Sequence, residues 1–187
     1  MRYTIVMQPA STQALRYRSA TIALHWISAL LVVTLWTIGQ TVDVFPNGPL
    51  RIDYRSVHIL LGMALGAVLL ARLGWRLTRH DTLPPLDHGV LLAIARTTHW
   101  LLYVLLIVTV VLGFANVWVR GDVIFNLFEV PAYDPGDRAL RQLVGGWHAL
   151  AANAVLIVAG VHAAAALFHH YVLRDATLRR MLPWRPR

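Results

Sequence analysis

The sequence predicts an all-α integral membrane protein: a four-helix bundle that forms a single domain over residues 1–187. Hydrophobic residues make up 57% of the chain and charged residues only 14%, whereas a soluble domain carries about 25% charged residues. The apolar residues gather in four blocks, at about 20–41, 56–76, 98–119 and 144–170. Each block reaches the ~20 residues that a helix needs to span the hydrocarbon core. Because the bilayer offers no water to backbone groups, the blocks are expected to be helices.

The distribution of arginine predicts the orientation of the spans. Lys and Arg together number 17, and all of them are arginine. Twelve lie in the N-terminal segment, in the 77–97 loop with its flanks, and in the C-terminal tail. The other two loops hold five arginines and six of the nine acids. The positive-inside rule therefore places both termini and the 77–97 loop in the cytoplasm. The net charge of +8 reflects topology, and no nucleic-acid partner is predicted.

The first two blocks each carry one histidine near an end. The first enters the membrane at Ser19 and holds His25 near the inner face. It is longer than a secretory signal core and no small-residue cleavage pattern follows it, so it is expected to remain as an uncleaved span. The turn at 45–49 leads into the second block, where His58 lies near the outer face.

The third and fourth blocks repeat this inner-then-outer arrangement. The third has His99 near the inner face. The long outer loop that follows is expected to end in a short surface helix at 137–146. The fourth block carries His148 near the outer face and His162 deeper, with His169 at the inner interface.

The depths of four histidines predict two metal centres. A histidine inside a span is costly to bury and by default marks a functional site. His148 and His162 are fourteen residues apart, about 1400° of helix, so they share one face at a separation of about 21 Å. His58 matches the depth of His148, and His25 matches that of His162. Two bis-histidine sites, one above the other, are therefore expected.

Haem is the metal group that these sites predict. Two axial imidazoles from facing helices fill the free positions of a haem iron, which suits electron transfer rather than oxygen binding. Glycine and alanine gather beside the histidines, where a planar macrocycle needs space. The chain has no cysteine, which excludes thiolate ligation, cysteine-bound iron–sulfur clusters and covalent c-type haem.

Further side chains are candidates for secondary contacts. His99 could replace His25 as ligand, or contact a haem propionate or a quinone. His169 is expected at the interface, with a propionate, quinone or proton-handling contact as the alternative. Arginines near the span ends could neutralise propionates by bidentate pairing: Arg16, Arg18, Arg51, Arg55 and Arg96.

Short motifs around these histidines follow one another in a characteristic order: Ala23–Trp26, Val57–Gly62, Thr98–Tyr103, Trp147–His148, His162–Tyr171 and Asp175–Met181. Each motif is weak alone, but their order and spacing together are specific. From about Arg16 to Pro183 the chain resembles the bacterial cytochrome b561 family of small inner-membrane di-haem cytochromes b.

The resemblance implies a function for the predicted sites. It implies two haems b, with His25 and His162 on the cytoplasmic side and His58 and His148 on the outer side. It also implies a multi-pass protein of the bacterial inner membrane that oxidises superoxide at the outer face and delivers electrons to ubiquinone. A basic outer patch would steer the superoxide anion, and its candidate members are Arg51, Arg55, Arg138 and Arg141.

Two other functions are compatible with a histidine-bearing bundle. One is a cytochrome b anchor subunit, which passes electrons between quinone and a partner dehydrogenase or hydrogenase and would co-purify with that subunit. The other is a transporter or metal-binding membrane protein without haem. A transporter is expected to carry intramembrane acids, and none of the nine acids lies centrally in a span.

Overall fold

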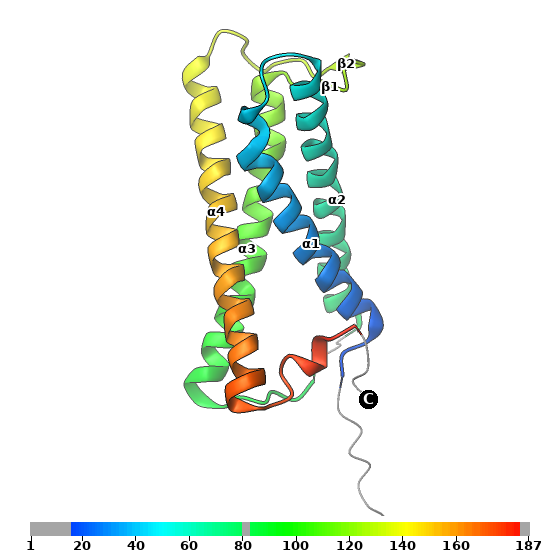
Figure 1. Ribbon diagram of the computed structural model, residues 1–187, viewed down its shortest axis with the longest axis vertical. Helices are drawn as coiled ribbons and strands as arrows, with labels where there is room; N and C mark the ends of the chain where they lie inside the picture. The colour runs from blue at the N-terminus through cyan, green and yellow to red at the C-terminus, as the bar shows by residue number, and fades with distance from the viewer. Residues whose placement is uncertain (1–15, 80–82, 184–187) are drawn as a thin grey trace, which may run out of the picture.

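The computed structural model describes residues 16–79 and 83–183, and four long helices dominate it. They are α1 (Ser19–Thr41), α2 (Pro49–Arg79), α3 (Gly89–Arg120) and α4 (Arg138–Phe168). The helices run up and down along one axis (Figure 1). All four are long and apolar enough to cross a membrane. The prediction of an all-α membrane four-helix bundle is thereby confirmed.

Short elements connect and extend the helices: η1 (Val42–Val44), β1 (Val123–Ile124), β2 (Phe128–Glu129), the π-helical turn η2 (His169–Leu173) and η3 (Arg179–Met181). Strands β1 and β2 form an antiparallel hairpin in the loop between α3 and α4. We call this end of the bundle the hairpin end and the opposite end the tail end (Figure 1). Both described ends of the chain meet at the tail end, where the Tyr17 amide donates to the Arg180 carbonyl over 3.3 Å.

The prediction of a separate surface helix at 137–146 is wrong, because α4 runs unbroken from Arg138. Asp137 caps this helix, its carboxylate accepting a hydrogen bond from the Leu140 amide at 2.8 Å. An aspartate at this position satisfies an amide that the first turn leaves free. Nothing after it breaks the helix, since the paired glycines Gly145 and Gly146 cost helix stability without removing a backbone hydrogen bond. His148 therefore stands on the same rigid rod as His162.

A small packed core lies at the middle of the bundle. Its buried members come from all four helices: Leu35, Leu65, Leu69, Leu106 and Val155. Other large apolar side chains point outward, as Leu70 and Ile157 do with 72% and 67% of their surface exposed. Such a surface suits a lipid environment, in which apolar side chains face hydrocarbon.

The four helices associate as two pairs. Helix α1 packs chiefly on α2, and α4 packs chiefly on α3. The pairs meet along α2 and α3, where a Cβ on Gly66 would stand 3.3 Å from Val110. Contact between α1 and α4 is sparse, and we call this line the α1–α4 seam. One hydrogen bond that crosses it runs from Trp36 Nε1 to Asn153 Oδ1, at 2.8 Å.

The end of α3 offers a test of the fold. Gly121 has φ +68°, and a Cβ there would lie 2.8 Å from the Ala132 Cβ. We expect Gly121→Ala to destabilise the protein by at least about 1 kcal/mol, since a left-handed conformation and a clash both oppose the methyl group. Thermal unfolding in detergent checks this. Gly74→Ala is the control, because its Cβ meets nothing within 4 Å, and an unchanged or higher melting temperature is expected there.

Candidate functional site

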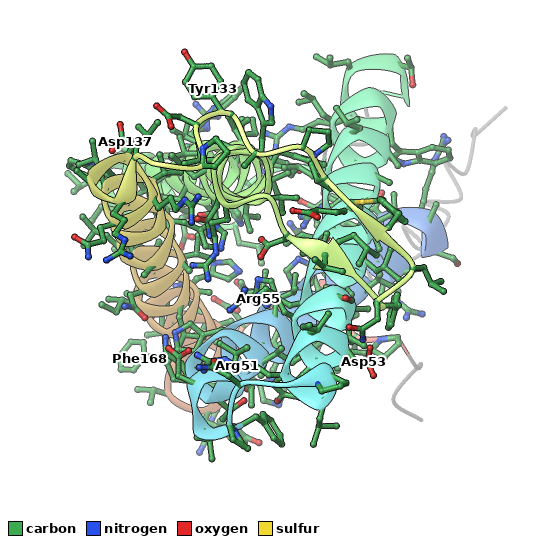
Figure 2. The ribbon with its side chains drawn as sticks, turned by 90° about the horizontal axis from the view of Figure 1, so that it is seen from above. Arg51, Asp53, Arg55, Tyr133, Asp137 and Phe168 are labelled. Atoms are coloured by element: carbon green, nitrogen blue, oxygen red, sulfur yellow. The ribbon has the colours of Figure 1, made fainter. Side chains whose placement is uncertain are left out.

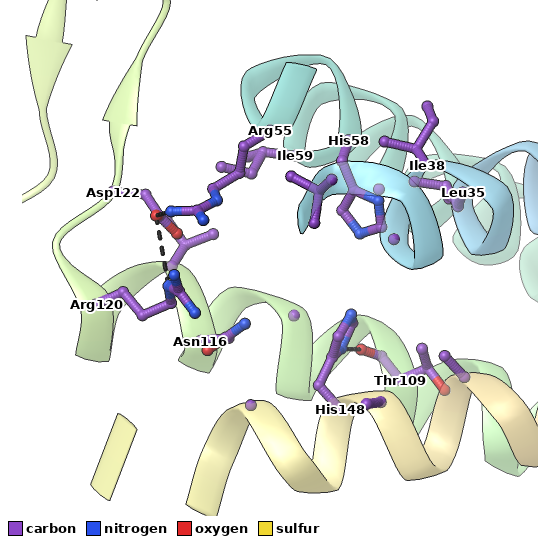
Figure 3. A pocket seen from close by; sticks show the side chains of 18 of the residues that line it. Leu35, Ile38, Arg55, His58, Ile59, Thr109, Asn116, Arg120, Asp122 and His148 are labelled. Atoms are coloured by element: carbon purple, nitrogen blue, oxygen red, sulfur yellow. Dashed lines mark hydrogen bonds and ion pairs between the residues drawn. The ribbon is translucent and has the colours of Figure 1, made fainter. Parts of the chain in front are cut away.

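At the hairpin end, His58 of α2 and His148 of α4 face each other (Figure 3). Their ring centroids are 6.2 Å apart and the rings are nearly perpendicular, at 79°. Each ring lies against a glycine of the neighbouring helix in its pair. A Cβ would stand 3.5 Å from His58 Cε1 at Gly39 and 3.2 Å from His148 Cε1 at Gly113. These glycines leave the space that the two imidazoles occupy.

The orientation of the His148 ring is set by a backbone contact. Its Nδ1 lies 3.1 Å from the Thr109 carbonyl oxygen, and because a carbonyl only accepts, Nδ1 is the donor. This bond fixes the tautomer, in which Nε2 carries no hydrogen and keeps an electron pair that can bind a metal. The same arrangement orients histidines that bind metals in other proteins.

A large cavity surrounds this histidine pair (Figure 3). Its volume is about 940 Å³ and all four helices contribute to its wall. Typical pockets for small molecules and cofactors measure about 300–1,000 Å³, so this one accepts a large ligand. Small residues widen the cavity, because their side chains fill little of it: Gly62, Gly113, Gly145, Gly146 and Ala149.

Arginines line the cavity on its hairpin side, and Arg55 and Arg120 are seen there in Figure 3. Arg55 donates to the buried Asp122 at 3.0 Å, and Arg120 lies 3.6 Å from the same carboxylate. Arg138 and Arg141 also line the cavity. With Asp43, the lining therefore holds four arginines against two aspartates. Seen along the bundle axis, Arg55 lies toward the centre (Figure 2).

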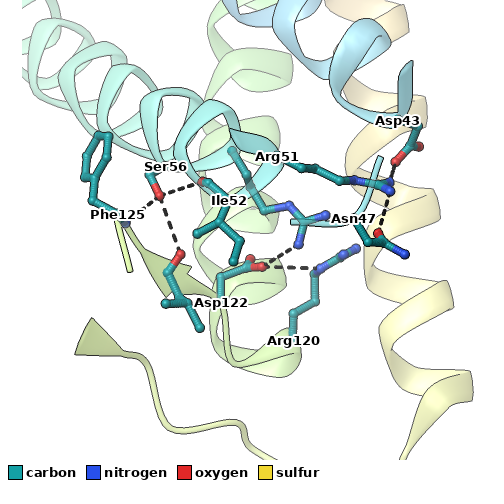
Figure 4. Close-up of polar contacts among 10 residues, drawn as sticks. Asp43, Asn47, Arg51, Ile52, Ser56, Arg120, Asp122 and Phe125 are labelled. Atoms are coloured by element: carbon teal, nitrogen blue, oxygen red, sulfur yellow. Dashed lines mark hydrogen bonds and ion pairs between the residues drawn. The ribbon is translucent and has the colours of Figure 1, made fainter. Parts of the chain in front are cut away.

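The structure separates the two arginines that the sequence grouped at this end. Arg55 reaches the cavity, whereas Arg51 forms an ion pair with Asp43 and donates to Asn47 at 2.8 Å (Figure 4). Arg120 and Asp122 were missed by the sequence reasoning. Their positions after the third span carried no signal, since the link between Arg55 and Asp122 joins residues far apart in the chain.

The hairpin is fastened to α2 by a buried serine (Figure 4). Ser56 is fully buried, donates to the Ile52 carbonyl at 2.8 Å and accepts from the Phe125 amide at 2.8 Å. A second bond joins Asn126 to Asp53 at 3.2 Å. These contacts hold the segment that carries Asp122 over the end of α2.

At the tail end, His25 of α1 and His162 of α4 form the second pair. Their ring centroids are 6.3 Å apart, and the His99 ring lies 5.1 Å from that of His162. If two imidazoles bound one metal from opposite sides, each ring centroid would lie about 3.2 Å from the metal, given a metal–nitrogen bond of about 2.0 Å. The two centroids would then be about 6.4 Å apart. The spacing of His25 and His162 fits this geometry, and so does that of His58 and His148, whereas His99 lies too close to His162.

Two arginines that the sequence assigned only to topology lie near this pair. Arg72 stacks over the Tyr103 ring at 5.3 Å, and Arg76 lies 5.8 Å from both Tyr103 and Trp100. Arg72 also lies near His25. In residues 16–79 and 83–183, neither arginine forms an ion pair with an acid. Both are therefore candidates to neutralise an anionic group beside the histidines.

The other predicted tail-end contacts serve different purposes. Arg16 donates to the Leu182 carbonyl, and Arg18 is the N-cap residue of α1. His169 Nδ1 donates to the Asp175 carboxylate at 2.5 Å, a partner that the sequence reasoning missed. Burial raises the pKa of Asp175, but the hydrogen bonds from His169 and Thr177 outweigh it and bring the pKa below its ordinary value. This carboxylate is ionised at neutral pH.

The donor set fits haem better than a bare metal ion. Within the described part of the chain, no group of three or more His, Asp or Glu side chains is placed to hold a metal ion. Each histidine pair offers two ligands at opposite-side spacing. A macrocycle that supplies the remaining ligands completes such a site, and the cavity around His58 and His148 has room for one.

Comparison with known proteins identifies relatives over nearly the whole chain. The family model described as Prokaryotic cytochrome b561 matches residues 16–184. The chain is 31% identical to the probable superoxide oxidase CybB of Yersinia pestis, covering 90% of this chain and 96% of that one. It is 31% identical to cytochrome b562 of Cereibacter sphaeroides, over 94% and 99% of the two chains. It is 29% identical to cytochrome b561 homolog 1 of Escherichia coli K12, over 91% and 98%.

The glycine that faces His148 provides a test of the hairpin-end site. We expect Gly113→Leu to push the His148 ring out of place, because even a Cβ there would lie 3.2 Å from Cε1. If this pair holds one of two haems, that haem should be lost and the haem absorbance of the purified protein should fall by about half. Gly160→Leu is the control, since a Cβ at this exposed position meets nothing within 4 Å. Equal haem in both variants would contradict the assignment.

Proposed function

The chain belongs to the prokaryotic cytochrome b561 family, and from this premise we propose that it carries electrons from superoxide to ubiquinone through two haem b sites. As a family member it is a multi-pass electron carrier of the bacterial inner membrane, of the oxidoreductase type, and the family implies haem b. The observation that carries the proposal is the pair of bis-histidine sites at opposite ends of one bundle.

The orientation follows from the arginine distribution. Within the described residues most arginines lie at the tail end, which favours the cytoplasmic side for that end. In this orientation His58 and His148 lie toward the periplasm, and His25 and His162 lie toward the cytoplasm. Residues 1–187 would then act as one membrane domain, with both termini in the cytoplasm.

His58 with His148, and His25 with His162, would hold the two haems. When bound, haem b supplies a one-electron carrier inside the membrane. The chain itself positions the ligands: the Thr109 carbonyl fixes the His148 tautomer at 3.1 Å, and Gly39 and Gly113 leave space for the rings. His99 and Arg72 stand beside the tail-end pair, where they would contact a propionate or the quinone.

Superoxide suits the hairpin end as a substrate because it is an anion. Positively charged surfaces lined by low-dielectric walls raise the rate at which anions arrive. Arg55, Arg120, Arg138 and Arg141 line the cavity there. Each superoxide loses one electron and leaves as dioxygen, so two superoxide ions and two protons convert one ubiquinone to ubiquinol. The relative from Yersinia pestis that is named a probable superoxide oxidase supports this substrate.

Alanine variants of the histidines test the ligand assignment. We expect His58→Ala and His148→Ala to lose one haem per chain, and His25→Ala and His162→Ala to lose the other. His99→Ala should keep both, because its ring is too close to His162 for opposite-side ligation. Reduced-minus-oxidised spectra with haem counted per chain give the answer. Loss of a haem in His99→Ala but not in His25→Ala would transfer the ligand role to His99.

Removing one arginine at the cavity mouth tests the substrate. The side chain of Arg138 is exposed and lines the cavity. We expect Arg138→Gln to lower the rate of superoxide-dependent ubiquinone reduction by a few fold at low ionic strength, and the difference should shrink as salt is added. Arg174→Gln is the matched control, because it removes the same charge from an exposed side chain at the tail end, far from the cavity. A protein that binds haem yet never oxidises superoxide, and that co-purifies with a dehydrogenase, would be an anchor subunit instead.

A further inference from the structure

The segment after α4 returns across the tail end and contacts the start of α1. The π-helical turn η2 ends at Arg174, which adopts a left-handed conformation with φ +57°. This reverses the chain, and Asp175–Leu182, which we call the strap, then crosses from the base of α4 to the base of α1 (Figure 1). The strap is thus a second connection between α1 and α4, beside their sparse direct contact.

One end of the strap is locked to the root of α4. His169 Nδ1 donates to Asp175 Oδ2 at 2.5 Å, and the Asp175 amide donates to the His169 carbonyl at 3.1 Å. The other Asp175 oxygen accepts from the Thr177 amide at 2.8 Å. His169 lies two helical turns beyond His162 on nearly the same side of the helix. The lock is therefore attached to the helix that carries one member of the tail-end pair.

The other end of the strap is locked to α1 next to the second member of the pair. Trp26 Nε1 donates to the Met181 carbonyl at 2.7 Å, and the Trp26 ring meets the His25 ring edge-on with centroids 5.6 Å apart. Arg16 donates to the Leu182 carbonyl. Arg180 also donates to the Pro84 carbonyl at 2.7 Å, which ties the strap to the loop between α2 and α3.

We infer that the strap is a positioning element that holds His25 opposite His162 across the α1–α4 seam. The inference rests on the proposed function, because it concerns the haem that this pair would bind. The physical reason is that the two histidines belong to different helix pairs, and the direct packing between α1 and α4 is too sparse to fix their separation. Without the strap, the tail end of α1 would lose the hydrogen bonds that hold it toward α4, while the hairpin end would keep its own contacts.

The rate of haem loss tests this inference. Haem transfer from purified holoprotein to excess apomyoglobin should show two phases, and the tail-end phase is the one that disappears in His25→Ala. We expect Trp26→Phe, which keeps an aromatic ring beside His25 but removes the donor to Met181, to accelerate that phase by about tenfold. Asp175→Asn, which weakens the lock on His169, should accelerate the same phase. The hairpin-end phase should not change in either variant.

Matched controls separate the strap from general effects. Trp147→Phe alters the tryptophan next to His148 in the sequence. Asp87→Asn alters an acid at the tail end that forms no ion pair with any described residue. Both should leave the tail-end phase unchanged. Asp175→Glu, which restores the charge, should recover most of the slow loss. A variant that fails to fold would lose both phases together, and Trp26→Phe guards against this because 41% of the Trp26 surface is already exposed.

The outcomes distinguish this inference from the proposed function. If the wild-type protein holds two haems and both variants leave the tail-end phase unchanged, the strap has no positioning role, and the haem assignment stands. Equal acceleration of both phases would also overturn the inference, because the strap would then stabilise the whole bundle. A wild-type protein without haem, or with a tail-end phase that survives His25→Ala, would overturn the ligand assignment itself.

Discussion

The α1–α4 seam is the constraint on which the rest of this structure depends. Each helix finds most of its packing within its own pair, α1 with α2 and α3 with α4. Both histidine pairs join opposite sides of this division, since His25 and His58 belong to the first helix pair and His148 and His162 to the second. Burying an ionisable side chain in a membrane is costly unless it is partnered. A group bound between the members of each pair would satisfy the histidines and also join the two halves.

The same constraint explains where the apolar core lies. Val155 stands seven residues from His148 and seven from His162, so two helical turns separate it from each. With Leu35, Leu65 and Leu106 it fills the bundle between the two sites. Trp36 and Asn153 add a hydrogen bond across the seam near this level. The middle of the bundle is thus closed by packing, and the large cavity lies on its hairpin side.

The sequence was sufficient for the features that depend on helical periodicity and depth. Hydropathy predicted four membrane helices, and the fourteen-residue spacing of His148 and His162 predicted that each would meet a histidine of similar depth from another helix. What the sequence could not provide were contacts that depend on the path of a loop. Asp122 beside Arg55 and Asp175 beside His169 are placed by loops whose path no local pattern encodes. Arg72 over Tyr103 depends instead on how α2 packs against α3. The predicted separate surface helix at 137–146 is instead the first part of α4, which begins directly after the Asp137 cap.

The separation of the two histidine pairs along α4 has an electrical consequence. A rise of 1.5 Å per residue over fourteen residues gives about 21 Å, roughly two thirds of a hydrocarbon core about 30 Å thick. A unit charge that crosses the whole membrane exchanges about 2.3 kcal/mol per 100 mV with the transmembrane voltage, so a charge moving between the two depths exchanges about 1.5 kcal/mol. In the proposed orientation an inward-moving electron travels toward the negative side. The voltage of an energised membrane would therefore oppose each transfer and hold electrons at the hairpin end.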